Sequence, residues 1–173
     1  MLSREVIVQA LILQAAILLV PPIIYILYTK NPRLIGITRE NMLSCIILGL
    51  AAGIPLALLS ISLDKVGFRN QIAVELSKKL GLMDIFFLNI FVVAPSEELL
   101  FRGFLQPKIG LFPASLLFGL VHWFGYFNVP QVIGATFLGL ILGLLFEWKK
   151  NIVTPIVAHA TTNIFSMVFI RTF

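Results

Sequence analysis

The 173-residue sequence contains one cysteine, Cys45, and two histidines, His122 and His159. A single cysteine excludes an internal disulfide and any cysteine-rich metal site, and Cys45 lies in an apolar run, where we expect a small buried hydrophobe. Charged residues make up 12% of the chain, about half of the fraction in soluble domains, whereas hydrophobic residues make up 59%. That much apolar surface cannot be hidden in one water-soluble core. The composition therefore predicts an integral, multi-pass protein of the cell membrane or an equivalent membrane.

The net charge of +5 lies mainly in the segments that connect apolar runs, where it would meet the headgroups of the lipid bilayer. Basic residues do not alternate with aromatic ones on a water-exposed face, so nucleic acid is excluded as a partner. The chain contains no internal repeat and no shift in composition that would mark a second domain. We expect one integral membrane domain over residues 1–173, with a motif-bearing core at 83–170.

Apolar segments long enough to form helices recur along the chain and predict an all-α polytopic membrane protein with about six transmembrane helices. The segments are Val6–Tyr28, Asn41–Leu63, Met83–Gln106, Gly110–Phe127, Val132–Trp148 and Ile152–Ile170. Pro21 and Pro22 should kink the first helix or end it early, and Gly134, Gly139 and Gly143 suit close helix packing in the fifth. The amphipathic stretch 71–80 is predicted to lie at the membrane interface, between the second and third spans.

The third segment carries three charges, Glu97, Glu98 and Arg102, each of which costs about 2.5–3.5 kcal/mol at mid-bilayer depth. On a helix, Glu98 and Arg102 are four residues apart and differ by ~40°, so they can pair on one face. Glu97 is rotated by ~100° from Glu98 and has no cationic partner on its own helix. A buried carboxylate without a cation beside it suits a general base or acid near neutral pH.

Two further motifs lie on other apolar segments. His159 and Asn163 share one helix face and could donate hydrogen bonds to a developing oxyanion, and Phe118 lies one turn before His122. Counted at about 1.5 Å per residue, Glu97, His122 and His159 all fall near the middle of a core about 30 Å thick. The matched depth predicts one buried polar site on the third, fourth and sixth helices.

Taken singly, these residues also have purely structural interpretations. Glu98 and Arg102 could form an intramembrane ion pair without catalytic function, and His122 could be a hydrogen-bonded core residue. His159 with Asn163 could join helices at ~0.6 kcal/mol per contact, and Asn89 is expected to do the same. The co-occurrence of the motifs at one depth favours the functional interpretation.

The patterns E-E-x-x-x-R (Glu97, Glu98, Arg102), F-x-x-x-H (Phe118, His122) and H-x-x-x-N (His159, Asn163) occur in this order on three segments. Together they resemble the CPBP family of intramembrane proteases, which groups CAAX proteases with bacteriocin-processing enzymes and includes the type II CAAX prenyl endopeptidases. The resemblance spans Glu97 to Asn163. The first ~80 residues carry no motif, and the chain is shorter than many relatives.

The resemblance implies an intramembrane endopeptidase that cleaves a membrane-tethered peptide or protein, either a prenylated CAAX-type C-terminus or a leader peptide. In this interpretation Glu97 activates the attacking water with help from His122, His159 and Asn163 stabilise the oxyanion, and Glu98, Arg102 and Phe118 support the site. No cofactor is firmly implied. The metalloprotease-like alternative is a zinc ion held by Glu97, His122 and His159 with an open position.

Two rival functions remain open. The first is a non-catalytic immunity, maturation or scaffold protein of the same fold. The second is a proton-coupled transporter, since buried Glu and His also serve as proton relays. The transporter is disfavoured because the sequence shows no further polar residues leading from the site toward either surface and no pair of broken helices in matching halves.

Overall fold

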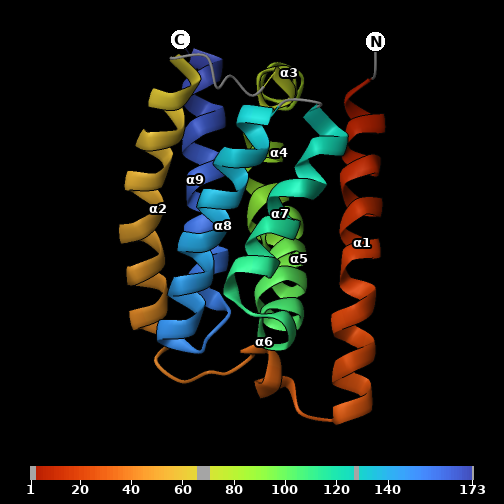
Figure 1. The fold of residues 1–173 in the computed structure, drawn as a ribbon. Coiled ribbons are helices and arrows are strands. Elements are labelled where there is room, and N and C mark those ends of the chain that lie inside the picture. Colours follow the sequence, from red (N-terminus) through yellow and green to blue (C-terminus); the bar gives the residue numbers. More distant parts are fainter. Residues whose placement is uncertain (1–2, 66–70, 127–128, 173) are drawn as a thin grey trace.

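The computed structural model describes residues 3–65, 71–126 and 129–172, without the side chains of 64–65, 71–73 and 124–126. Every regular element within these ranges is a helix (Figure 1), as the sequence predicted. Four helices of the described part are long and apolar enough to cross a membrane. They are α1 (Arg4–Thr29), α2 (Met42–Lys65), α8 (Val129–Lys149) and α9 (Val153–Thr172). The protein therefore has an all-α polytopic membrane fold.

The other two predicted spans differ from the expected regular helices. The fourth corresponds to α7 (Leu111–Tyr126), whose described apolar part is shorter than the four long helices. The third is a succession of short pieces: α4 (Leu82–Leu88), η2 (Asn89–Val93), α5 (Ala94–Glu98), η3 (Leu99–Leu105) and α6 (Gln106–Ile109). The count of six spans therefore stays a prediction.

The two prolines of the first helix do not end it. α1 runs without interruption through Pro21 and Pro22 to Thr29, and Lys30 then takes a left-handed conformation that closes the helix. In hydrocarbon, no water can bind the backbone groups that a broken helix would free, so continuing the helix is the less costly solution. The expectation of an early end was wrong.

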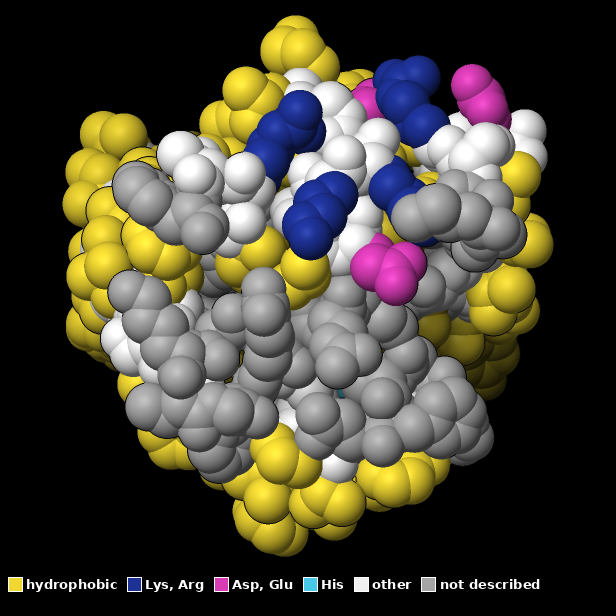
Figure 2. Space-filling view, turned by 90° about the horizontal axis from the view of Figure 1, so that it is seen from above, with side chains coloured by type: hydrophobic (Ala, Val, Ile, Leu, Met, Phe, Trp, Pro, Cys, Tyr) yellow, Lys and Arg dark blue, Asp and Glu magenta, His cyan; other side chains and the backbone are white. Residues whose placement is uncertain are grey.

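Helix α3 (Gln71–Lys79) lies across one end of the bundle and is seen end-on in Figure 1, beside the two chain termini. Arg171 at the end of α9 donates hydrogen bonds to the carbonyls of Ser77 and Leu80, which ties α3 to the bundle. Seen from this end, Lys and Arg side chains gather toward the middle while hydrophobic side chains form much of the rim (Figure 2). This arrangement agrees with the interfacial helix predicted from the sequence.

The glutamate-bearing segment alternates between α-helical and wider π-helical turns. The π-helical pieces η2 and η3 flank the short helix α5, which carries Glu97 and Glu98. Pro95 in the first turn of α5 has no N–H to donate to the preceding turn. Next to it, Ser96 Oγ donates to the Val93 carbonyl at 2.9 Å. Single-turn π segments are frequent at functional sites.

Glycines allow close contact between neighbouring helices. A Cβ on Gly53 of α2 would lie 2.6 Å from Cβ of Thr161 on α9. On α8, a Cβ on Gly143 would lie 2.6 Å from Gln106 Oε1, whereas one on Gly134 would have no atom within 4 Å. Close packing at α8 is therefore confirmed for Gly139 and Gly143 but not for Gly134.

Candidate active site

The predicted Glu98–Arg102 pair is present at the junction of α5 and η3. Arg102 Nε lies 3.1 Å from Glu98 Oε2, and both side chains are almost completely buried. Arg102 Nη2 also donates to the Gly139 carbonyl of α8 at 3.3 Å. The guanidinium carbon lies 4.2 Å from the centre of the Phe118 ring of α7, which adds a cation–π contact. The cation is thus held by groups from three elements.

Glu98 has a second partner on α9. His159 Nδ1 lies 2.7 Å from Glu98 Oε1, and the imidazole is 3% exposed. An ionised carboxylate only accepts hydrogen bonds, so Nδ1 carries the hydrogen that is donated to Glu98. His159 Nε2 then faces Glu97, with its Oε2 at 3.9 Å. The sequence predicted neither contact, because both join helices that are distant along the chain.

Glu97 takes no part in the ion pair between Glu98 and Arg102 on its own segment, as the sequence predicted. Its side chain is buried, and within the described part of the chain its Oε2 has no hydrogen-bond partner. The 3.9 Å separation from His159 Nε2 is longer than a hydrogen bond. Glu97 therefore presents an uncommitted carboxylate oxygen beside an imidazole whose other nitrogen is fixed.

Asn163 lies one turn after His159 on α9, on the same helix face. Its Nδ2 donates to Asn89 Oδ1 at 3.0 Å, and Asn89 Nδ2 in turn donates to the Ile85 carbonyl at 2.8 Å. Asn89 therefore links two helices, which confirms its expected role. One of the two carboxamide hydrogens of Asn163 takes part in this bond, so the other can bind a further acceptor.

His122 and His159 both contact the Phe118 ring. The ring centroids lie 4.7 Å apart for His122 and Phe118, and 5.8 Å apart for His159 and Phe118. His122 Nδ1 lies 2.6 Å from the Phe118 carbonyl oxygen, so this nitrogen carries the donated hydrogen. Phe118 is itself 1% exposed and packs edge-on against Phe101. This aromatic residue connects the histidine of α7 with the charged cluster.

The zinc site of the metalloprotease-like alternative does not form in the described part of the chain. No three His, Cys, Asp or Glu side chains there lie in an arrangement that could hold a metal ion. Glu97, His122 and His159 therefore do not make up the ligand set that the metalloprotease alternative requires, and that alternative has no support from the geometry. The two imidazoles instead pack on one aromatic ring.

Sequence reasoning missed a further set of polar contacts to α8, made by Gln106 one turn after Arg102. Gln106 Nε2 donates to the Gly143 carbonyl at 3.0 Å and to Glu147 Oε1 at 3.1 Å. Gln106 is buried, whereas Glu147 is exposed near the end of α8. No hydrogen bond or ion pair among the described residues joins Gln106 to Arg102, so the expectation that no polar residues lead from the site toward a surface stays a prediction. The signal was present as two series with a spacing of four: Glu98, Arg102 and Gln106, and Gly139, Gly143 and Glu147.

Comparisons with known proteins agree with these motifs. A family model described as type II CAAX prenyl endopeptidase Rce1-like matches residues 79–165 and so includes all three motifs. The chain is also 38% identical over 85 residues to a Bacillus subtilis protein named "Uncharacterized protein YpbD". That alignment covers 49% of this chain and 44% of the relative, so it spans less than half of either. No solved structure matches the chain.

Proposed function

The chain belongs to the Rce1-like family of type II CAAX prenyl endopeptidases, and we propose that it hydrolyses a peptide bond of a membrane-tethered substrate with Glu97 as general base. The family implies a CAAX-type intramembrane protease, and the substrate we propose is a prenylated C-terminus or a leader peptide. The observation that carries the proposal is the pair of buried carboxylates with different partners. Glu98 binds Arg102 and His159, whereas Glu97 keeps an uncommitted oxygen 3.9 Å from His159 Nε2.

Glu97 is suited to activate water because its Oε2 is buried and has no hydrogen-bond partner in the described structure. In the proposed reaction Glu97 takes one proton from a water molecule, and the water oxygen bonds to the carbonyl carbon of the scissile peptide. The tetrahedral intermediate then collapses, the C–N bond breaks, and the proton passes from Glu97 to the leaving amide nitrogen. Proton transfer by a positioned side chain contributes typically 10²–10⁴-fold.

His159 and Asn163 are the groups we propose for stabilising the oxyanion. Glu98 fixes the imidazole through Nδ1, so His159 Nε2, when protonated, can donate to an oxygen placed near Glu97. Asn163 would supply the carboxamide hydrogen that its bond to Asn89 does not use. His122 is proposed to help hold the water, and Phe118 to position both imidazoles.

The test uses purified protein in detergent, incubated with a prenylated CAAX peptide and a panel of leader peptides, with products identified by mass spectrometry. Wild-type protein should cleave at least one peptide, and chelator should leave cleavage unchanged. Glu97→Gln should lower kcat by about 10²-fold or more.

Glu40→Gln is the matched control, because Glu40 is exposed and pairs with Arg33 at 3.4 Å. Wild-type activity in Glu97→Gln would overturn the proposal. Full rescue of a cellular phenotype by Glu97→Gln would favour the scaffold alternative.

One observation favours the transporter as a second candidate. Gln106 lies one turn after Arg102 and donates to exposed Glu147 near the end of α8, so polar groups lie between the buried cluster and that end. Buried Glu and His side chains serve as proton relays in pumps and transporters. Proteoliposomes with a pH gradient decide between the candidates. Proton flux that disappears in Glu97→Gln would support transport, whereas peptide cleavage without flux would support the protease.

A further inference from the structure

The carboxamide of Asn163 has two possible orientations, because a half-turn of the group exchanges its oxygen and its nitrogen. Only one orientation is useful to an oxyanion. The nitrogen donates hydrogen bonds, whereas the oxygen accepts them and would repel a developing negative charge. Asn163 is half-buried on α9, one turn after His159. Whatever selects the orientation of this carboxamide therefore decides whether Asn163 can stabilise an oxyanion.

The partner of this carboxamide is Asn89, the first residue of η2, whose side chain is buried. Asn163 Nδ2 lies 3.0 Å from Asn89 Oδ1. Asn89 Nδ2 donates to the Ile85 carbonyl at 2.8 Å and lies 3.8 Å from Met167 Sδ. These two contacts use both amide hydrogens of Asn89. Its oxygen is therefore the atom that faces Asn163.

An Asn163 carboxamide turned the other way would place its oxygen against the oxygen of Asn89. Two acceptors would then meet without a hydrogen between them in a buried site, so the donor orientation should prevail by at least about tenfold. Asn89 cannot adapt by turning as well, because it would lose its bond to the Ile85 carbonyl. Glu98 has the same effect on the other proposed oxyanion donor, since it fixes His159 through Nδ1 at 2.7 Å.

We propose that Asn89 is a positioning residue that holds the Asn163 carboxamide with its nitrogen as the donor. One hydrogen of Asn163 Nδ2 binds Asn89, and the second is left for the oxyanion. This inference rests on the proposed function and adds a residue that lies outside the three sequence motifs. Asn89 acts through Asn163 and does not touch the substrate.

The test is a double-mutant cycle on the rate of peptide cleavage. Asn89→Ala should lower kcat about tenfold and leave KM unchanged, because the oxyanion exists only in the transition state. Asn163→Ala should lower kcat by ~10²-fold. If Asn89 acts through Asn163, the double variant should also lose ~10²-fold, whereas independent residues would lose ~10³-fold together. A loss of ~10³-fold in the double variant, or a raised KM with an unchanged kcat in Asn89→Ala, would overturn the inference.

Ile85→Val is the matched control for a general loss of packing. The Ile85 side chain is buried in the same core cluster as Met167, and its carbonyl, which binds Asn89, is retained in the variant. Ile85→Val should lower the melting temperature about as much as Asn89→Ala does. It should nevertheless keep the wild-type kcat. The same loss of kcat in both variants would trace the effect to packing and overturn the inference.

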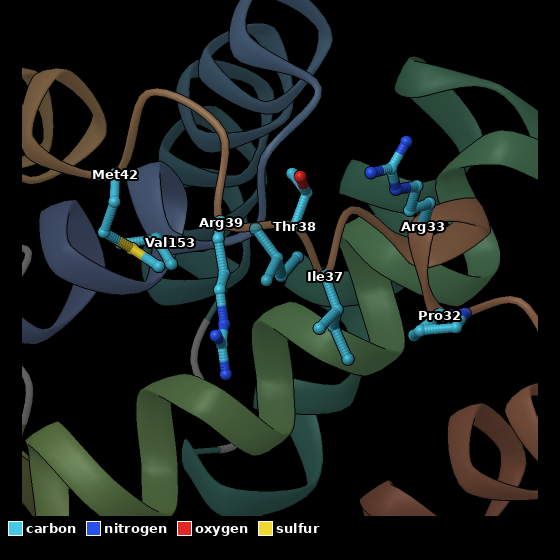
Figure 3. Close-up of a pocket in the computed structure, with 8 residues that line it drawn as sticks. Pro32, Arg33, Ile37, Thr38, Arg39, Met42 and Val153 are labelled. Atoms are coloured by element: carbon cyan, nitrogen blue, oxygen red, sulfur yellow. The ribbon is translucent and has the colours of Figure 1, made fainter.

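Arg39→Gln is the control for a change far from the site. Arg39 lines a pocket of about 510 Å³ between the α1–α2 connection and the start of α9 (Figure 3). Val153 at this pocket precedes Asn163 by ten residues on α9, a rise of ~15 Å. Arg39→Gln should therefore keep the wild-type kcat and leave the effect of Asn89→Ala unchanged. Loss of the Asn89→Ala effect in the Arg39→Gln protein would contradict direct positioning by Asn89.

A measurement without cleavage separates this inference from the proposed function. Nitrogen-15 NMR in detergent follows the exchange of the Asn163 side-chain amide hydrogens with water, and Asn163→Ala identifies their signal. Asn89→Ala should speed exchange of the bonded hydrogen at least about tenfold, since its hydrogen bond is lost. This change in a protein that cleaves no peptide supports the positioning of Asn163 and counts against the proposed peptidase. Unchanged exchange would overturn the inference even if the wild-type protein cleaves peptide.

Discussion

A methyl group at Gly139 should lower the proposed peptidase activity more than its modest cost in stability explains. An ideal Cβ at this position would lie 3.3 Å from Arg102 Nη2 and 3.3 Å from Phe118 Cδ1, so these neighbours must move by a few tenths of an ångström. The bond from Arg102 to the Gly139 carbonyl is already 3.3 Å long and would be lost. Arg102 holds Glu98 and Glu98 holds His159, so the displacement reaches the imidazole.

The magnitude follows from two opposing effects on stability and one effect on catalysis. Alanine in place of a mid-helix glycine gains about 0.5–1 kcal/mol, and the lost hydrogen bond from a charged group costs about 1.5–3 kcal/mol. The net change is a loss of roughly 1–2 kcal/mol of stability. Misplacing a catalytic group by 1 Å can cost ~10²-fold, so a shift of a few tenths should lower kcat roughly tenfold, or about 1.4 kcal/mol of barrier.

Gly134→Ala is the matched control on the same helix, because a Cβ there would have no atom within 4 Å. It should raise the thermal midpoint in detergent and leave kcat at the wild-type value. Both variants are compared by peptide cleavage and by tryptophan fluorescence on heating. The reasoning is refuted if Gly139→Ala keeps the wild-type kcat, or if its activity falls only in proportion to its folded fraction.

Three further predictions concern the charged pair, the α2–α9 contact and the two asparagines. Arg102→Met leaves the buried Glu98 without its cation and with only the hydrogen bond from His159, and should destabilise the protein by about 3 kcal/mol. Adding Glu98→Gln should restore most of the melting temperature but not the activity, and equal melting of both variants would contradict the pairing. Gly53→Val should destabilise by about 1–3 kcal/mol because its Cβ would lie 2.6 Å from an α9 side chain, and an unchanged melting temperature would disprove close packing there. Asn163→Ala should lower kcat by ~10²-fold. Asn89→Ala should cost about 1 kcal/mol of stability and lower kcat less than Asn163→Ala does. If both variants lose the same factor in kcat, Asn163 has a structural role.

The local features of the site could be predicted from the sequence because they depend on spacing within one helix. Glu98 and Arg102 are four residues apart, so any helical turn brings them together, and Glu97 necessarily lies on another face. The same reasoning predicted the helix α3, since residues 71–80 present a polar and an apolar face, and its place at the membrane interface stays a prediction. The apolar composition of the long segments was sufficient to predict an all-α membrane fold.

The contacts between helices could not be predicted in this way. The bond from His159 to Glu98 joins residues 61 positions apart, and the bond from Asn163 to Asn89 joins residues 74 apart. Both depend on how α9 packs against the glutamate-bearing segment. The π-helical pieces η2 and η3 also have no sequence signature comparable to a cap or a turn. The spacing of four residues from Arg102 to Gln106 and from Gly139 to Gly143 is visible in the sequence. Only the packing shows that Arg102 and Gln106 donate to the carbonyls of these two glycines.

Chemical rescue of Glu97→Ala by formate tests the central claim most directly, since a small carboxylate can replace a missing general base. We predict that Glu97→Ala cleaves the prenylated peptide at least about 10²-fold more slowly than wild type. Added formate should then raise its rate by tenfold or more without affecting the wild-type protein. A Glu97→Ala protein that cleaves at the wild-type rate, with or without formate, would contradict the assignment of Glu97 as the water-activating base.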